Sequence, residues 1–112
     1  MDNEERAEQL IKKYGFDFAN IPKEEIRELI QREIADYQSG SSEYLRVLCG
    51  YLYCIGDASD ACLISKVKYG INFDVGCMIE GEWIENLKSG NTKKRKVIID
   101  DFVSYYTNYF GI

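Results

Sequence analysis

Apolar residues recur at helical spacing along most of the chain, in segments that glycines separate. The clearest stripe lies within residues 42–55, where positions three or four apart are occupied by Leu45, Leu48, Leu52 and Ile55. Tyr44, Cys49 and Tyr51 widen this stripe, which predicts a central helix. The chain has one proline, and its nine glycines lie mainly between such segments, whereas a β-sandwich needs a turn signal about every 8 to 12 residues. The pattern predicts an all-α fold.

Start and stop signals divide the chain into about six helices. We expect them to span residues 3–14, 22–38, 42–55, 58–69, 73–87 and 92–110. The segments between them are short, so consecutive helices should form antiparallel pairs, as in a small helical-repeat stack, or α-α superhelix. A length of 112 residues suits one compact domain, and we predict a single helical domain over residues 1–112.

Several polar residues stand where helix caps are expected. Asp57 follows a glycine, and Asp60 three positions later can complete a capping box with it. Asn20, Asn72 and Asn91 precede three further helices and have the short side chains that accept hydrogen bonds from the first helical turn. These residues predict where helices begin and have no implied role in binding.

The residue types that most enzymes need are missing. The chain has no histidine, which removes the commonest general base and the usual Ser-His and Cys-His nucleophile pairs. Neither a G-x-G-x-x-G motif nor a P-loop motif is present. The four cysteines lack the spacing of structural zinc sites, and we predict that all are buried as small apolar residues: Cys49, Cys54, Cys62 and Cys77. We therefore predict no enzymatic activity, no cofactor and no metal.

The N-terminal segment and the hydropathy pattern indicate a compartment. The chain begins MDNEER, which is acidic and lacks the basic start and apolar core of a signal peptide. No apolar run approaches the roughly 18 residues of a membrane span. These features predict a cytoplasmic protein that does not enter a membrane.

Most of the negative charge lies between residues 55 and 87. The six acids of this stretch face only Lys66 and Lys68, which leaves a charge of −4 out of the net charge of −5. On a continuous helix over residues 73–87, Asp74, Glu82 and Glu85 would point to solvent. Such a face is either simply solvated or directed at a partner, and acid-base or metal chemistry is a remaining alternative.

Aromatic residues are the other candidates for binding. Trp83 is expected in the core, whereas a core position and a binding position are equally open for the tyrosines of the last helix, because nine tyrosines exceed what core packing needs. Together with the acids, they give six candidate partner-binding residues: Asp74, Glu80, Glu82, Glu85, Tyr105 and Tyr109.

Residues 93–96 form a basic run, Lys-Lys-Arg-Lys, at the start of the last helix. Proteins that bind nucleic acid use such clusters to contact phosphates. The chain is net acidic, however, with a sequence pI of about 4.8, so we expect a solvated surface or a contact with an acidic patch on a partner. Nucleic-acid binding therefore ranks third, after two hypotheses in which the chain binds a protein or a peptide.

Residues 51–82 resemble a pattern found in small helical bacterial proteins. Its strongest pieces are Gly56-Asp57, Asp60, Lys68, Asn72-Phe73-Asp74 and Gly76-Cys77. These proteins resemble the immunity proteins encoded beside polymorphic or contact-dependent toxins. The resemblance ends after residue 82, where a Leu-Cys-Gly-like turn would be expected and Trp-Ile-Glu-Asn stands instead. Gly56, Asp57, Asn72 and Phe73 would be caps and loop anchors, so the pattern bears more on fold than on toxin binding.

The resemblance and the acidic segment together favour a non-enzymatic protein-binding module. The leading hypothesis is an immunity protein that neutralises a bacterial toxin, plausibly a nuclease, by covering its basic active site with an acidic helical face. The alternative is a regulatory or scaffolding helical-repeat domain that binds a peptide or a protein subunit. In either case the expected partner is a protein, for the leading hypothesis a cognate toxin domain.

Overall fold

The structure is a computed structural model, and it describes residues 1–111. Within these residues it contains seven α-helices and two short 3₁₀ helices and no β-strand. In chain order they are α1 (Asn3–Tyr14), η1 (Phe18–Asn20), α2 (Lys23–Ala35), α3 (Glu43–Ile55), η2 (Ala58–Asp60), α4 (Ala61–Gly70), α5 (Phe73–Met78), α6 (Gly81–Ser89) and α7 (Thr92–Phe110). The all-α prediction is confirmed. None of these helices is both long and apolar enough to cross a membrane.

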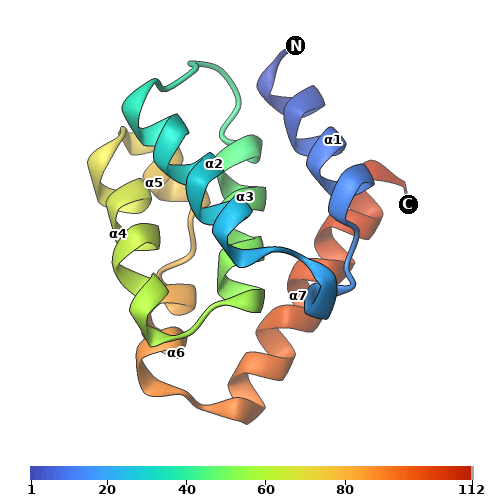
Figure 1. The fold of residues 1–112 in the computed structure, drawn as a ribbon, viewed down its shortest axis with the longest axis vertical. Coiled ribbons are helices and arrows are strands. Elements are labelled where there is room, and N and C mark those ends of the chain that lie inside the picture. Colours follow the sequence, from blue (N-terminus) through green and yellow to red (C-terminus); the bar gives the residue numbers. More distant parts are fainter. Residues whose placement is uncertain (112) are drawn as a thin grey trace.

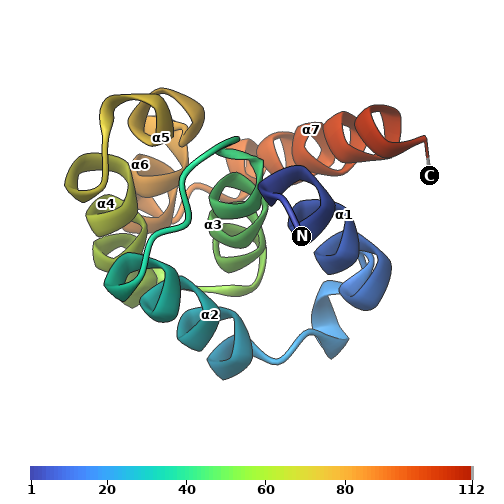
Figure 2. The same ribbon diagram turned by 90° about the horizontal axis from the view of Figure 1, so that it is seen from above.

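Helix α3 lies in the middle of the molecule, and the other α-helices are arranged around it (Figures 1 and 2). Twelve of its thirteen residues are buried. A helix that is apolar on nearly all sides is stable only when neighbours cover all of it, and α1, α2, α4, α5 and α6 all pack against α3. The prediction of a central helix from its broad apolar stripe is therefore confirmed.

Helix α7 crosses α3 where the central helix has a glycine. A Cβ atom at Gly50 would collide with the ring of Phe102, so the absence of a side chain lets this ring sit directly against the α3 backbone. Phe102 is 2% exposed and packs edge-on against the rings of Tyr51, Trp83 and Tyr106 at centroid distances of 5.9, 6.1 and 5.2 Å. This aromatic contact fixes α7 on the central helix.

The predicted helix over residues 73–87 is interrupted in the structure. Ile79 and Glu80 are extended, and they separate α5 from α6. Lys68 at the end of α4 donates from Nζ to the carbonyl oxygens of Gly76 and Ile79, at 2.7 and 2.5 Å. A lysine that satisfies carbonyls at a helix end supplies the hydrogen bonds that a continuous helix would have made, and this explains why the break is tolerated.

Two of the predicted caps are confirmed as side-chain hydrogen bonds on α-helices. Asn72 Oδ1 accepts from Val75 N at 2.9 Å, and Asn91 Oδ1 accepts from Lys94 N at 3.0 Å. The Asp57–Asp60 capping box is also present, although it begins η2, and α4 starts only at Ala61. The prediction for Asn20 is wrong, because this side chain donates to Asp17 and closes η1.

The prediction that all four cysteines are buried is wrong for two of them. Cys49 and Cys54 are buried in α3, but Cys62 and Cys77 are exposed. The buried residues of α4 are Ala61, Ile64 and Val67, and Cys62 does not belong to this stripe. Because α5 is a separate short helix in which only Val75 is buried, Cys77 also faces outward.

Candidate protein-binding site

Helix α7 carries a partly exposed stripe beside the side that packs on α3. Asp101, Tyr105 and Tyr109 are each four positions apart, so they lie along one side of the helix. The two tyrosine side chains are 40% and 42% exposed, and their rings are stacked with centroids 5.8 Å apart. Two rigid aromatic rings therefore remain partly accessible along α7, and both were among the residues that the sequence proposed for binding.

The hydroxyl groups of the α7 tyrosines all donate to carboxylates. Tyr109 donates to Glu4 of α1 at 2.7 Å, Tyr106 donates to the buried Glu43 at 2.6 Å, and Tyr105 approaches the same carboxylate at 3.4 Å. Burial and Glu43 raise the pKa of Tyr105 and of Tyr106, and the hydrogen bond to Glu4 followed by burial raises the pKa of Tyr109. These tyrosines therefore stay protonated.

A pocket of about 140 Å³ opens beside Tyr105. Carboxylates from three segments reach it: Glu80 from the linker between α5 and α6, Glu82 from α6, and Asp101 from α7. The remaining lining is one cation and a set of apolar or aromatic side chains, namely Arg46, Trp83, Ile98, Phe102 and Tyr105. The pocket thus combines an acidic set of side chains with apolar walls.

Arg46 of α3 is the one cation that lines this pocket, and it is 7% exposed. Its Nη2 donates to Glu80 Oε1 at 2.8 Å. Its guanidinium lies 4.4 Å from the centroid of the Tyr105 ring, with the rings of Trp83 and Tyr106 at 5.2 and 5.3 Å. Cation–π contacts of this kind hold a buried guanidinium in place. Arg46 therefore fixes the position of Glu80 through its hydrogen bond and packs against the ring of Tyr105.

Glu82 and Asp101 have no comparable partner. Within the part of the chain that the structure describes, neither carboxylate is paired with a cation. Partial burial, together with the neighbouring Glu80 carboxylate, raises the pKa of Glu82, and the charge of Lys94 opposes this. Glu82 thus lies beside another acid and has no cation paired with it.

We call this surface the acidic tyrosine face and define it by Glu4, Glu80, Glu82, Asp101, Tyr105 and Tyr109. It contains four of the six residues that the sequence proposed for partner binding. Glu85 is exposed on α6, one turn beyond Glu82, and does not line the pocket. Asp74 is exposed in the first turn of α5 and is not part of the face.

Asp101, Glu4 and Arg46 were not among the residues predicted from the sequence. The spacing of Asp101, Tyr105 and Tyr109 was a usable signal, since residues at i, i+4 and i+8 share one side of a helix. No local signal could have placed Glu4 beside Tyr109, which is 105 residues away in sequence. Trp83 is 2% exposed, so its predicted core position is confirmed, although it also lines the pocket.

The basic run at the start of α7 does not form a uniform cationic surface. Arg95 donates from Nη2 to the carbonyl oxygens of Cys54 and Gly56 at 3.0 and 3.2 Å, and so closes the C-terminal end of α3. Lys96 pairs with Asp100 at 3.1 Å. Only part of the run, then, remains available to bind an anion.

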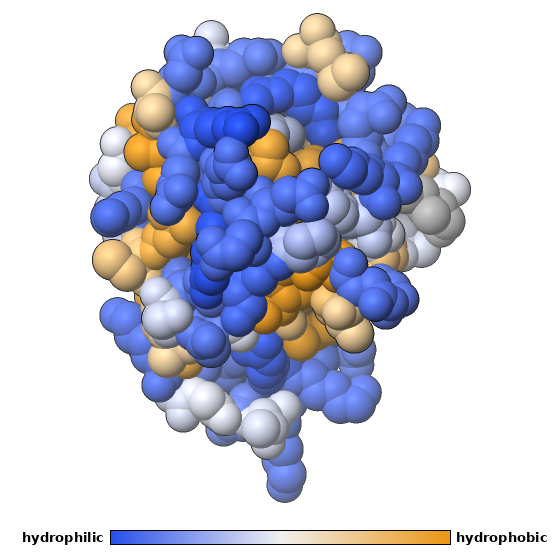
Figure 3. Space-filling view, in the orientation of Figure 1, coloured by the Kyte–Doolittle hydropathy of each residue, from blue (hydrophilic) through white to orange (hydrophobic). Residues whose placement is uncertain are grey.

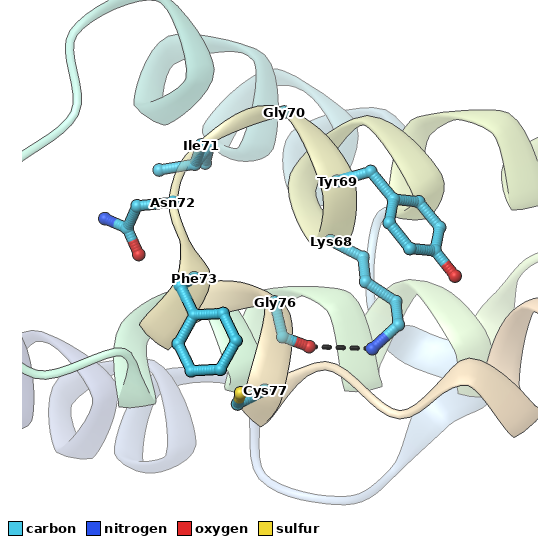
Figure 4. A pocket seen from close by; sticks show the side chains of 8 residues that line it. All are labelled: Lys68, Tyr69, Gly70, Ile71, Asn72, Phe73, Gly76 and Cys77. Carbon is cyan, nitrogen blue, oxygen red and sulfur yellow. Dashed lines mark hydrogen bonds between the residues drawn. The ribbon is translucent and has the colours of Figure 1, made fainter.

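A second surface gathers apolar side chains at the turn between α4 and α5. We call it the apolar corner and define it by Tyr69, Ile71, Phe73 and Cys77, which line a hollow of about 540 Å³ (Figure 4). Phe73 is 83% exposed, so the expectation that it anchors the loop is wrong. Hydrophobic side chains also reach the surface along the α4 and α5 edge of the face seen in Figure 3.

The polar groups at the apolar corner are used by the fold. Lys68 is bonded to two carbonyl oxygens, as Figure 4 shows for Gly76, and Asn72 caps α5. A Cβ atom at Gly76 would lie 2.7 Å from the Lys68 carbonyl oxygen, so only glycine permits α5 to approach α4 this closely. Lys68, Asn72 and Gly76 belong to the motif that resembles immunity proteins, and here each of them has a structural role.

No group of three Asp, Glu or Cys side chains within residues 1–111 is arranged to hold a metal ion. No known family matches this chain, and no curated protein or solved structure is similar to it at a significant level. The fold and the site define an all-helical domain with an acidic, tyrosine-bearing surface on its first and last helices and on the segment around α6.

Proposed function

We propose that this chain is a non-enzymatic immunity protein, which neutralises a bacterial toxin, plausibly a nuclease, by covering its basic active site with the acidic tyrosine face. One observation carries the proposal. Glu82 and Asp101, two carboxylates without a paired cation, line a pocket beside Tyr105, which is one of two stacked and partly exposed tyrosines. The expected site of action is the cytoplasm, where such a protein would meet a toxin that acts on nucleic acid.

The arrangement suits rapid and tight binding to a basic partner. A negative surface attracts a positive one before contact and raises the association rate, most strongly at low salt. Tyrosines contribute a large contact area with little loss of conformational entropy, and hot spots of protein interfaces are enriched in them. Tyr105 is already held by Arg46 and Tyr109, so little ordering is required on binding.

Co-expression with the toxin encoded beside this gene tests the function. Wild-type protein should protect the cells, and Glu82→Lys/Asp101→Lys should protect poorly because it replaces two attractive charges by two repulsive ones. The association rate should fall about tenfold or more at low salt. Equal killing with and without the wild-type protein would end the immunity hypothesis.

A matched control distinguishes an effect of the acidic tyrosine face from an effect of the overall net charge. Asp36→Lys/Asp74→Lys introduces the same change in charge at two exposed acids outside the face. This variant should protect the cells nearly as well as wild type does. If both double variants lose protection to the same extent, overall charge matters and the acidic tyrosine face does not.

One feature favours the alternative function, in which the chain is a regulatory or scaffolding domain that binds a peptide. This feature is the apolar corner, which has two exposed aromatic rings. Exposed aromatic side chains around a hollow are typical of protein-binding surfaces. A partner that binds there would be insensitive to Glu82→Lys/Asp101→Lys and would be lost in Tyr69→Ala/Phe73→Ala.

A further inference from the structure

We infer that the pocket beside Tyr105 is a socket for one cationic side chain, a lysine or an arginine, from the partner protein. This inference deepens the proposed function and rests on it for the identity of the partner. It adds a specific element to the general attraction between an acidic face and a basic one. It predicts one basic residue whose head enters the pocket between Glu82 and Asp101.

The charges around the pocket require a further cation. Four carboxylates lie on or beneath it, namely Glu43, Glu80, Glu82 and Asp101. Arg46 is bonded to Glu80, and Lys94 acts on Glu82 only through its charge, without an ion pair within the described residues. With Arg46 and Lys94 both counted, the negative charges still outnumber the positive ones. An ammonium or guanidinium group entering here would find two carboxylates that are not paired with a cation among the described residues.

Arg46 supplies an independent sign that the pocket is incomplete. Its side chain lines the pocket and is more than nine-tenths buried, yet its Nη1 has no hydrogen-bond acceptor. A buried donor without an acceptor is unfavourable, and such groups are rare in native structures. A peptide that enters the pocket brings main-chain carbonyl oxygens along with its cationic side chain, and therefore carries the kind of group that Nη1 lacks.

The size and the walls of the pocket select the kind of cation. The carboxylates are not arranged to converge on a metal ion, so a cation with several spread N–H groups fits them better. A volume of about 140 Å³ would hold about four or five waters at about 30 Å³ each, which suits a side-chain head with part of its stem. Trp83, Ile98 and Phe102 provide apolar contact for methylene groups, as lysine and arginine stems require.

The test uses the intact protein without any toxin. Trp83 is the sole tryptophan of the chain and lines the pocket, so its indole N–H signal in NMR reports on the socket. The probes are N-acetyl-arginine amide and N-acetyl-lysine amide, with N-acetyl-norleucine amide as the neutral control of similar shape. The two cationic probes should shift the Trp83 signal saturably, the neutral one should not, and added salt should weaken the effect.

Substitutions that preserve shape localise the binding. Glu82→Gln/Asp101→Asn should lower the affinity for the cationic probes by about tenfold or more, because it removes both unpaired charges and keeps the side-chain volume. Asp36→Asn/Asp74→Asn is the matched control, since it removes two exposed charges elsewhere and should leave the probe affinity unchanged. Both variants change only exposed side chains, and the dispersion of their amide spectra verifies that they are folded.

The results separate the two proposals. Any of three results would overturn the socket. The norleucine amide could shift the Trp83 signal as much as the cationic probes do, or the cationic probes could cause no saturable shift up to their solubility limit. The third result is that Glu82→Gln/Asp101→Asn binds the cationic probes as well as wild type does. If one of these results is found and the protein still protects cells from the toxin, the socket is refuted and the immunity function is retained. Specific probe binding without protection from the toxin would keep the socket and refute the immunity function. The stronger of the two cationic probes identifies the side chain that the partner supplies.

Discussion

The acidic tyrosine face and the apolar corner both expose aromatic rings, but they differ in how their polar groups are used. At the corner, Phe73 is 83% exposed, and the nearby Lys68 and Asn72 are bonded to the backbone. At the face, Tyr109 is only 42% exposed, and the carboxylates of Glu82 and Asp101 are unpaired among the described residues. The two surfaces therefore offer a partner different groups: the corner offers exposed aromatic rings, and the face offers carboxylates that are not paired with a cation.

The two surfaces also depend on different supports. The acidic tyrosine face stands on the aromatic contact between α7 and α3, with Phe102 at its centre. The apolar corner is held by one lysine that joins the end of α4 to the backbone around α5. Damage to either support should therefore change one surface before it changes the other.

Phe102→Ala should have the largest effect. It opens a cavity between α3 and α7, and large-to-small changes at buried aromatic positions lower the free energy of unfolding by about 3–5 kcal/mol. Urea denaturation measures this, with Val97→Ala on the same helix as a control at a position that is 59% exposed. Affinity for the partner should fall together with stability, and unchanged affinity would show that the face does not depend on this contact.

Lys68→Met should have an intermediate effect. It keeps the apolar stem but leaves the carbonyl oxygens of Gly76 and Ile79 without their donor, at a cost of about 1–3 kcal/mol in the free energy of unfolding. Lys66→Met is the control, because Lys66 is exposed and makes no hydrogen bond within residues 1–111. Hydrogen exchange should speed up in α5 and leave α7 unchanged; faster exchange in both would mean that the two supports are not independent.

Alkaline pH should destabilise the protein through the buried Tyr106 of α7. Burial raises the pKa of Tyr106, so its hydroxyl stays protonated in the folded chain and ionises in the unfolded chain near pH 10. Its stabilising contribution is complete below that pH and is lost as the pH rises above it; the free energy of unfolding should fall by about 1.4 kcal/mol at one pH unit above. Urea denaturation at increasing pH measures the loss, and Tyr106→Phe should flatten the curve. An equally steep curve in this variant would remove Tyr106 as the cause.

Labelling of the cysteines should have the smallest effect and gives the sharpest comparison. Cys62 and Cys77 are exposed and should react first with a thiol reagent, whereas burial raises the pKa of Cys54 to about 12 and keeps it unreactive in the folded protein. Absorbance during labelling counts the fast thiols.

The label on Cys77 also tests the corner as a binding surface. A bulky group there should leave the affinity for the partner unchanged, because the acidic tyrosine face lies on other elements. A Cys77→Ser variant labelled at Cys62 is the control. Loss of affinity only when Cys77 is labelled would move the binding site to the apolar corner.

Much of the local structure was predictable because it depends on residues within one or two helical turns. Asn72 and Asn91 cap the helices that they precede, and the broad apolar stripe around Leu48 identified α3 as the central helix. The break at Ile79 was not predictable in this way. It depends on Lys68, eleven positions earlier, which reaches the carbonyl oxygen of Ile79 only after α5 has folded back on α4.

The candidate site shows the same division. Glu80, Glu82, Tyr105 and Tyr109 were recognisable as acids and aromatics with no obvious core role, but Asp74 and Glu85 had equal standing in sequence. The break at Ile79 places Glu80 against Arg46, and the packing of α7 brings Asp101 to the same pocket. The spacing of residues along the chain could predict neither the contact of Glu80 with Arg46 nor the position of Asp101 at this pocket.

The helical class, most helix starts, the central position of α3 and the excess of acid follow from periodicity, capping and composition, so they could be read from the chain. Tertiary packing sets which acids lie together, which aromatic rings stay exposed and which cations are already paired. Those outcomes depend on contacts between residues far apart in the chain, such as Glu4 with Tyr109 and Arg46 with Glu80, and such contacts form only when the helices pack around α3.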